Sequence, residues 1–394
     1  MRPITRRQVL RGLLLGFASG AASGLLSACA GGTTPSPTST ATASQPTAGQ
    51  PMLTPTGSSS GVGAAATPSP FVTPTVRIQR TLRVVTGGAV SDAGLFIAIE
   101  RGYFRDLGVS VQLDTSGAGG SGEVIPLLAS GQVDISGRAL AAALVNAVLQ
   151  GIRVPVVADK GQLRRGFGFH ALAVSKKLFD NGTVKTIAQL RGQKIALQSG
   201  DSAMEIVEIA KVLQTAGLTP RDIEVTTIRP SDMIPALQNA SVAAANLAEP
   251  TATIAIDQQG VATALLRGDS YVDILGNGFP IAGLIFAPSI VQDRALTVGL
   301  LAAYLKAVRV YNQAVSDPSI RNEVIDILIK YTTLKDRPLY DKMVWPGLAA
   351  DGRFDTSFLE QAQDLWLARG AIKQKVPIDQ LVDFSFLEDA AKQL

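Results

Sequence analysis

Residues 82–113, LRVVTGGAVSDAGLFIAIERGYFRDLGVSVQL, contain the pattern that decides the fold. The runs LRVVT and VSVQL at the two ends are apolar on both faces, as the strands of a buried parallel sheet are. Between them, Ala93, Phe96 and Ile97 fall on one face of a helix, and Gly102 stands where that helix ends. The stretch therefore predicts a strand–helix–strand unit of an α/β protein.

The same alternation continues outward in both directions. Further strand-like runs lie at residues 133–136, 154–158, 194–198, 224–228, 242–247 and 262–266, with helical patterns between them. After residues 279–287 the chain becomes helical to its end. Two arrangements fit: two domains in tandem, or one lobe built from both ends of the chain with a second lobe inserted, joined by crossing segments near 165–175 and 268–285.

The amino terminus has the features of an export signal. Arg6 and Arg7 precede an uncharged, apolar segment, residues 12–26, which is the length of a signal-peptide core and short for a membrane span. It ends in LSAC at 26–29, which resembles a bacterial lipobox, whose cysteine is lipidated and becomes the first residue after cleavage. Cys29 is the only cysteine, so we expect a lipid anchor there and no internal disulfide. The paired arginines resemble the Tat signal, and Tat and Sec export both remain open.

A long segment without charge follows the signal. Residues 30–76 are mostly Thr, Ser, Pro, Ala and Gly, which bury too little apolar surface to offset the entropy of ordering. We predict a disordered tether with a reach of roughly 35–40 Å. The formal charge of +4 is carried by four arginines within residues 1–28, which hold no acidic residue. Cleavage of the signal leaves a neutral protein, so nothing indicates a nucleic-acid partner.

The loops that follow the predicted strands are rich in small and polar residues. In an open α/β sheet the ligand lies outside the carboxyl ends of the strands, and small residues let it approach backbone N–H donors at helix starts. Such loops suit a small oxyanion. The candidate ligand-binding residues are Gly88, Ala89, Ser91, Asp92, Gly117, Gly119, Gly137, Arg138, Ala139, Lys160, His170, Asp201, Ser202, Asn246 and Glu249.

Several of these residues have a purely structural alternative. Ser202 and Glu205 have the spacing of a capping box. Glu249 before Pro250 resembles a helix N-cap followed by a first-turn proline. His170 fits either a buried core or hinge position or a place in the cleft between lobes.

The glycines at 117, 119 and 122 spell the dinucleotide-binding fingerprint G-x-G-x-x-G. That fingerprint belongs on the first strand–helix turn, whereas these glycines follow the second predicted strand, and Asp134 begins the next strand rather than ending it. A chain with one histidine and one cysteine also lacks histidine- or cysteine-based metal clusters. We therefore expect no catalytic residue, no metal site and no cofactor.

Six segments resemble the solute-binding lipoproteins of ABC importers, in the group that includes nitrate, alkanesulfonate, taurine and thiamine-pyrimidine-precursor receptors. They are SDAGLFIAIERGYFRDLGVSVQL (91–113), LLASGQVDIS (127–136), VPVVADKG (154–161), HALAVSKK (170–177), TIAQLRGQKIALQSGDS (186–202) and LQNASVAAANLAEP (237–250). The resemblance covers about residues 80–390. It implies the two-lobed periplasmic-binding-protein fold of type II, with a hinge between the lobes and a helical carboxyl-terminal region, and no catalytic activity.

The expected domains are a signal peptide at 1–28, a tether at 29–79, lobe 1 at 80–170 with 275–394, and lobe 2 at 171–274. The resemblance implies a protein anchored on the extracytoplasmic face of the cell membrane, which delivers a small solute to a permease and its ATPase; we expect a monomer. Two alternatives are a tethered sensor or adhesion module without transport, and a relative of thiamine-pyrimidine biosynthetic enzymes. The export signal, the single histidine and the missing cysteine cluster disfavour the enzyme.

The identity of the ligand remains open. A carboxylate beside an anion costs electrostatic energy, so Glu249 either points away as a cap or accepts N–H groups from an amino-bearing heterocycle. The candidates are sulfonates, nitrate or a similar oxyanion, and a pyrimidine precursor.

Overall fold

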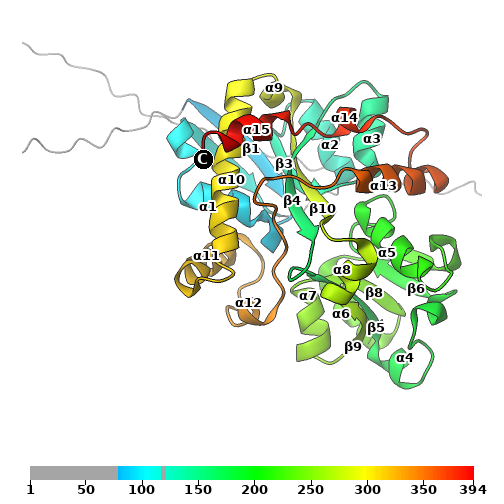
Figure 1. Cartoon of the computed structure of the whole chain (residues 1–394). Coiled ribbons are helices and arrows are strands. Elements are labelled where there is room, and N and C mark those ends of the chain that lie inside the picture. Colours follow the sequence, from blue (N-terminus) through cyan, green and yellow to red (C-terminus); the bar gives the residue numbers. More distant parts are fainter. Residues whose placement is uncertain (1–78, 117–120) are drawn as a thin grey trace, which may run out of the picture. The chain divides into compact units, whose positions relative to one another are not determined.

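The computed structural model describes residues 79–116 and 121–394. The predicted signal peptide, the tether, Cys29, Gly117 and Gly119 lie outside the described residues. Within them the chain forms two five-stranded sheets surrounded by helices (Figure 1). None of the helices in these two ranges is both long and apolar enough to cross a membrane.

The first sheet has the strand order β2-β1-β3-β10-β4. Its strands are β1 (Arg80–Thr86), β2 (Val109–Asp114), β3 (Ile135–Ala139), β4 (Val156–Leu163) and β10 (Phe279–Phe286). β2 and β3 run parallel to β1, whereas β10 lies antiparallel between β3 and β4. The strand–helix–strand unit predicted from residues 82–113 is thus the β1–α1–β2 edge of this sheet.

The second sheet has the order β7-β6-β8-β5-β9. Its strands are β5 (His170–Ser175), β6 (Lys194–Leu197), β7 (Glu224–Thr227), β8 (Ala244–Ala248) and β9 (Ala262–Arg267). β7 and β8 run parallel to β6, and β5 lies antiparallel between β8 and β9. The alternating residues of β5 enter two different cores: Leu172 and Val174 join the larger one, and Ala171 and Ala173 the smaller.

The apolar runs predict buried parallel strands, and each sheet also contains a strand that is antiparallel to its neighbours. Residues 279–286, expected within a crossing segment, form β10 and are buried along nearly their whole length. β5 begins shortly after β4 ends at Leu163, with no crossover helix between them. A parallel neighbour requires a long crossover connection, whereas an antiparallel neighbour does not. Because β5 and β10 each enter their sheet directly from the other one, they can pair antiparallel.

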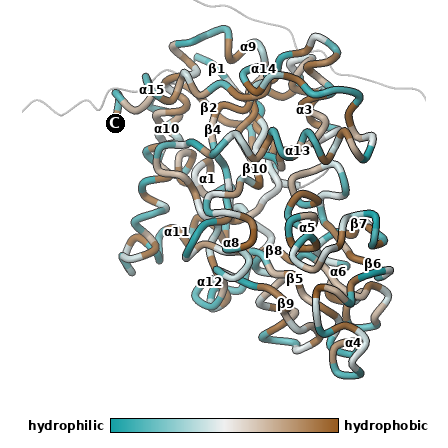
Figure 2. Tube along the Cα trace, turned by 45° about the vertical axis from the view of Figure 1, so that its right-hand side comes forward, coloured by the Kyte–Doolittle hydropathy of each residue, from teal (hydrophilic) through white to brown (hydrophobic). Residues whose placement is uncertain are grey.

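Helices cover both sheets. Those around the first sheet are α1 (Ala93–Glu100), α2 (Ser121–Ala129), α3 (Ala142–Leu149), α9 (Pro288–Val291), α10 (Arg294–Gln313) and α11 (Pro318–Tyr331). Those of the second are α4 (Lys176–Asp180), α5 (Met204–Gln214), α6 (Pro230–Asn239), α7 (Thr251–Thr253), the π-helix Ile254–Gln258 and α8 (Asp269–Leu275). The remaining helices are α12 (Leu339–Lys342), α13 (Ser357–Ala368), α14 (Ile378–Leu381) and α15 (Ser385–Ala391). Figure 2 shows hydrophobic residues along the inner strands and hydrophilic ones mainly on outer turns and helices.

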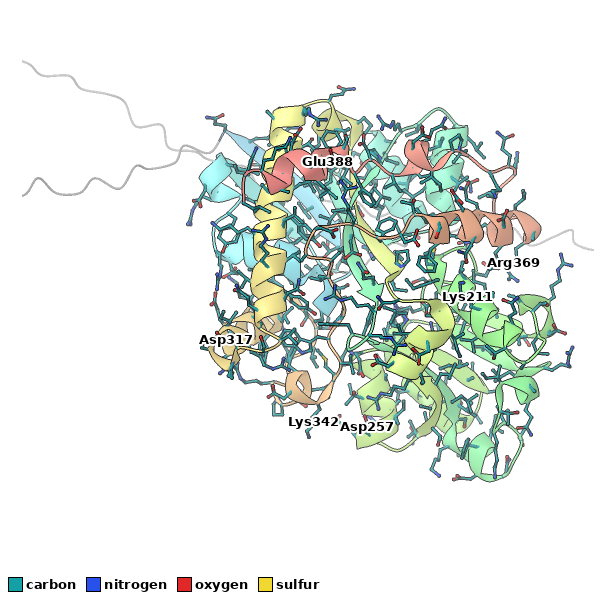
Figure 3. The ribbon with its side chains drawn as sticks, in the orientation of Figure 1. Lys211, Asp257, Asp317, Lys342, Arg369 and Glu388 are labelled. Carbon is teal, nitrogen blue, oxygen red and sulfur yellow. The ribbon has the colours of Figure 1, made fainter. Side chains whose placement is uncertain are left out.

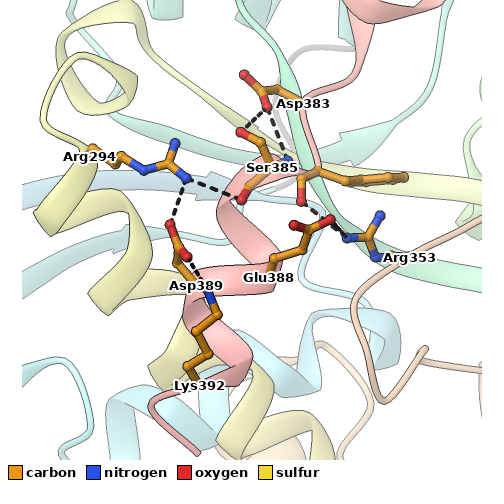
Figure 4. A network of polar contacts seen from close by, with 8 residues as sticks. Arg294, Arg353, Asp383, Ser385, Glu388, Asp389 and Lys392 are labelled. Carbon is orange, nitrogen blue, oxygen red and sulfur yellow. Dashed lines mark hydrogen bonds and ion pairs between the residues drawn. The ribbon is translucent and has the colours of Figure 1, made fainter.

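The core of the first part is closed by helices from the two ends of the chain. α1 packs on α10 so closely that a Cβ on Gly94 would lie 2.4 Å from the Tyr304 ring. Ion pairs fasten α15 to α10 and to the segment before α13: Arg294 to Asp389 at 2.7 Å and Arg353 to Glu388 at 3.2 Å (Figure 4). The carboxyl-terminal helices thereby belong to the same packed body as β1 and α1.

Two connecting segments, residues 164–169 and 268–278, link the sheets. They touch at two glycines, because a Cβ placed on Gly168 would lie 2.5 Å from the backbone carbonyl of Gly268. Only a residue without a side chain fits at this crossing.

Candidate functional site

The loops at the carboxyl ends of strands in both sheets meet. The Ala142 N–H, in the segment after β3, donates to the Ser202 carbonyl at 2.8 Å, and the Met204 N–H donates to the Leu140 carbonyl at 2.9 Å. Ala141 and Ala203 form an antiparallel bridge between these hydrogen bonds. The predicted position of a ligand, outside the strand ends, is therefore where the two sheets face each other.

A buried ion pair lies among the predicted residues of the first sheet. Lys160 Nζ lies 2.7 Å from Asp92 Oδ1, with 4% and 0% of these side chains exposed. Lys160, which was expected after a strand, lies within β4; it also donates to the Gly137 carbonyl at 3.3 Å, and Asp92 Oδ2 accepts the Ala89 N–H at 2.8 Å. A Cβ on Gly137, within β3, would come within 3.4 Å of Thr86, Asp92 and Lys160, so glycine lets these segments approach closely.

The predicted residues of the first sheet lie together around this pair. Ser91 faces Gly161 closely, since a Cβ there would lie 3.3 Å from the Ser91 side chain, and Gly88 (φ +64°) packs on Thr115. Arg138, half-buried at the end of β3, is the second cation of the group. Burial lowers the pKa of Arg138 by more than the nearby carboxylates, Asp92 foremost, raise it.

In the second sheet a buried polar cluster lies beneath the loop that meets β3. His170 Nδ1 lies 2.9 Å from Glu208 Oε2, and the Asn246 amide donates to the same carboxylate at 2.9 Å. The Tyr271 hydroxyl donates to Asn246 Oδ1 at 2.8 Å. His170 is therefore a buried residue with an internal partner, and Asn246 lies at the centre of the cluster.

Glu205 belongs to this cluster but bonds to backbone. Its carboxylate accepts the Ser199 N–H at 2.7 Å and the Gln198 N–H at 3.1 Å. Burial is the largest influence on this carboxyl and raises its pKa to about 7, helped by the neighbouring charge of Glu208. The expected capping box of Ser202 and Glu205 is not formed, because α5 begins at Met204 with Ala203 as its N-cap and Glu205 reaches further back along the chain.

The predicted residue Glu249 makes hydrogen bonds and an ion pair within the second part of the chain. Glu249 accepts the Thr253 N–H and hydroxyl, both at 3.0 Å, and pairs with Arg267 at 3.1 Å. The N-cap of α7 (Thr251–Thr253) is Pro250, so the expected arrangement of Glu249 as N-cap with a first-turn proline is not formed. The Glu249 carboxylate nevertheless accepts the N–H of the last residue of this short helix.

Asp201 lies three residues before α5, whose N-cap is Ala203. Its carboxylate pairs with Arg369, the C-cap of α13, at 3.1 Å. Lys211 of α5 also lies 5.6 Å from the Phe358 ring centre of α13. Figure 3 shows Arg369 and Lys211 where α13 passes over α5, and the ion pair of Asp201 links the loop before α5 to the end of α13.

Sequence reasoning missed Glu205, Glu208 and Tyr271 as members of this group. The first two stand three apart on a helix whose inner face is otherwise apolar, a spacing that puts both carboxylates on one buried face. Buried carboxylates require polar partners. The spacing of Glu205 and Glu208 could therefore have predicted a buried polar cluster beside this helix.

Comparisons with known proteins agree with this architecture. Residues 90–308 match the family described as NMT1/THI5 like. The putative aliphatic sulfonates-binding protein of Escherichia coli (strain K12) is 30% identical over 128 residues, 32% of this chain and 38% of that protein. The matched part is therefore well under half the length of that relative.

Solved structures resemble the whole described part. The ligand-binding component of an ABC-type import system from Staphylococcus aureus, with zinc bound, has a TM-score of 0.60 at 12% identity, covering 79% of this chain and 99% of that one. The alkanesulfonate-binding protein of Xanthomonas axonopodis pv. citri bound to MOPS has 0.59 at 18%, covering 77% and 98%. The periplasmic nitrate-binding protein of Synechocystis PCC 6803 has 0.60 at 14%, covering 80% and 89%. These likenesses confirm the expected two-lobed periplasmic-binding-protein fold.

Proposed function

Because the chain belongs to the NMT1/THI5-like family, we propose that it is the solute-binding component of an ABC-type importer. It captures a small solute between its lobes and delivers it to a permease driven by an ATPase. Relatives with this fold are described as binding sulfonates and nitrate, which supports a small oxyanion as the ligand class, with a pyrimidine precursor as the second candidate. We assign the protein no catalytic activity.

The observation that carries this proposal is the meeting of the strand-end loops at residues 140–142 and 202–204. Two narrow connecting segments cross at Gly168 and Gly268, which suits a hinge between a lobe of residues 80–170 with 275–394 and a lobe of residues 171–274. A ligand that contacts both lobes binds the closed state better than the open one, and this difference drives closure.

A thermal-shift screen of sulfonates, nitrate, bicarbonate and pyrimidines, combined with small-angle scattering, tests the proposal. A ligand should raise the melting temperature and reduce the radius of gyration. Mass spectrometry of the solute that co-purifies from the native host identifies the ligand directly. Absence of any stabilising solute, with no change in scattering, would overturn the proposal.

We further propose that Cys29 anchors the monomeric protein to the extracytoplasmic face of the cell membrane. Cys29→Ala should abolish incorporation of radiolabelled palmitate and leave the protein soluble or held only by an uncleaved signal. Arg6→Lys with Arg7→Lys is the matched control, because it keeps Cys29 and tests only the export route. Equal palmitate labelling of Cys29→Ala and the unchanged protein would refute the anchor.

A further inference from the structure

The loop between β6 and α5 holds two successive backbone N–H groups directed at one carboxylate. Ser199 and Gln198 donate to the two oxygens of Glu205 at 2.7 and 3.1 Å. Successive N–H groups that converge in this way form a cradle for an anion, and the adjacent start of α5 adds partial positive charge. The cradle lies beside the contact between the lobes, because Ser202 and Met204 of the same loop bond to residues 140–142.

Above its pKa of about 7, Glu205 itself supplies the anion in this cradle. Only 5% of Glu205 is exposed, and Asn246 Nδ2 lies 3.4 Å from its Oε1. A ligand oxyanion would have to displace a buried carboxylate that is bonded to these N–H groups. It would also meet Glu208, whose charge is close enough to influence the ionisation of Glu205.

A buried carboxylate oxygen beneath the cradle has no hydrogen-bond donor among the described residues. Glu208 Oε1 is buried and makes no hydrogen bond within the described part of the chain. Buried acceptors normally have a donor. The face beneath the cradle therefore offers additional negative and acceptor character rather than a place for a second anion.

We propose that Glu205 determines ligand specificity by occupying the anion cradle of the second lobe, so that oxyanions are excluded there. This inference rests on the proposed function, and it limits the ligand: the group that faces the second lobe is neutral or an N–H donor. Any anionic group of the ligand then faces the first lobe, where Arg138 and Lys160 lie.

The test is a gain of binding. Glu205→Ala frees both N–H groups, so methanesulfonate or sulfate should bind at about pH 8 at least about tenfold more tightly than to the unchanged protein, as measured by calorimetry. The ¹⁵N–¹H shifts of Ser199 and Gln198 should move on addition of the anion in the variant only. Glu208→Ala is the matched control, because it removes a carboxylate from the next turn of α5 but frees no backbone N–H.

Three outcomes would overturn the inference. One is a folded Glu205→Ala variant with no gain in anion binding; another is an equal gain in Glu208→Ala, which would indicate only a change in net charge. The third outcome can be measured even if Glu205→Ala does not fold. It is rapid hydrogen exchange of the Ser199 and Gln198 amide protons in the unchanged protein, which would show that Glu205 does not accept hydrogen bonds from them. The solute screen on the unchanged protein tests the proposed solute-binding function separately. That function and the role of Glu205 can therefore be refuted independently.

Discussion

Replacing Asp92 with alanine should lower the free energy of unfolding by about 3–5 kcal/mol, the usual cost of breaking a buried ion pair. Among the described residues, the variant leaves the buried Lys160 ammonium with the Gly137 carbonyl, at 3.3 Å, as its remaining acceptor. It also removes the acceptor of the Ala89 N–H. Denaturant unfolding followed by circular dichroism measures the loss.

Two controls separate burial from the mere loss of a charge. Asp180→Ala breaks the exposed pair of Lys176 and Asp180, 47% and 56% exposed, and should cost no more than about 0.5 kcal/mol. The double variant Asp92→Leu with Lys160→Met should regain much of the loss, since no unpaired charge remains buried. A loss below about 1 kcal/mol in Asp92→Ala would contradict the account of a tightly buried pair.

The same pair should matter for ligand binding, because it joins two segments that the sequence predicted to face a ligand. Lys160 was predicted from a place after a strand, whereas it lies within β4, and composition could not reveal that it pairs with Asp92. Their contact joins the segment after β1 to β4, which are distant in the sequence and come together only in the folded protein. The predicted loops are thus brought together, while the partners of their charged side chains depend on strand order.

Strand positions could be predicted more fully than strand directions. Runs such as 82–86 and 194–198 are apolar on both faces and coincide with β1 and β6. An apolar run contains no information about direction, which is set by where the connection places the strand. The composition of residues 279–287 is typical of a strand, yet the sequence alone predicts a crossing segment there. The reason is that the neighbouring strands β3 and β4 lie far back in the chain.

Stability should fall as the pH rises from about 5 to about 8, because three buried groups retain protons in the folded protein. Burial raises the pKa of Glu205 to about 7 from an ordinary 4.5, and that of Asp159 to about 6 from 3.8, against the opposing hydrogen bonds from Ala349 and Gly161. Burial lowers the pKa of His170, but the charges of Glu208, Glu205 and Glu249 together outweigh it and raise the pKa above 6.5.

Each of the three groups has a higher pKa in the folded protein than its ordinary value. Between about pH 4 and pH 7 the folded protein binds more protons than the unfolded chain, so the free energy of unfolding decreases with pH. For the two carboxyls the penalty grows from their unfolded to their folded pKa; for His170 the stabilisation present below 6.5 is lost through its raised pKa. Since one pKa unit corresponds to about 1.4 kcal/mol, the combined decrease should reach a few kcal/mol.

Denaturant unfolding at four pH values between about 5 and 8 measures this dependence. Glu205→Gln and Asp159→Asn should each flatten part of the slope, the first mainly between about pH 4.5 and 7 and the second between about pH 4 and 6. Below about pH 4 the trend should reverse, because surface carboxylates such as Asp114 and Asp222, whose pKa values are lowered by hydrogen bonds, lose their contacts on protonation. Stability that rises steadily from pH 5 to pH 8 would mean that Glu205 and Asp159 ionise without penalty, and hence that water reaches them where the structure buries them.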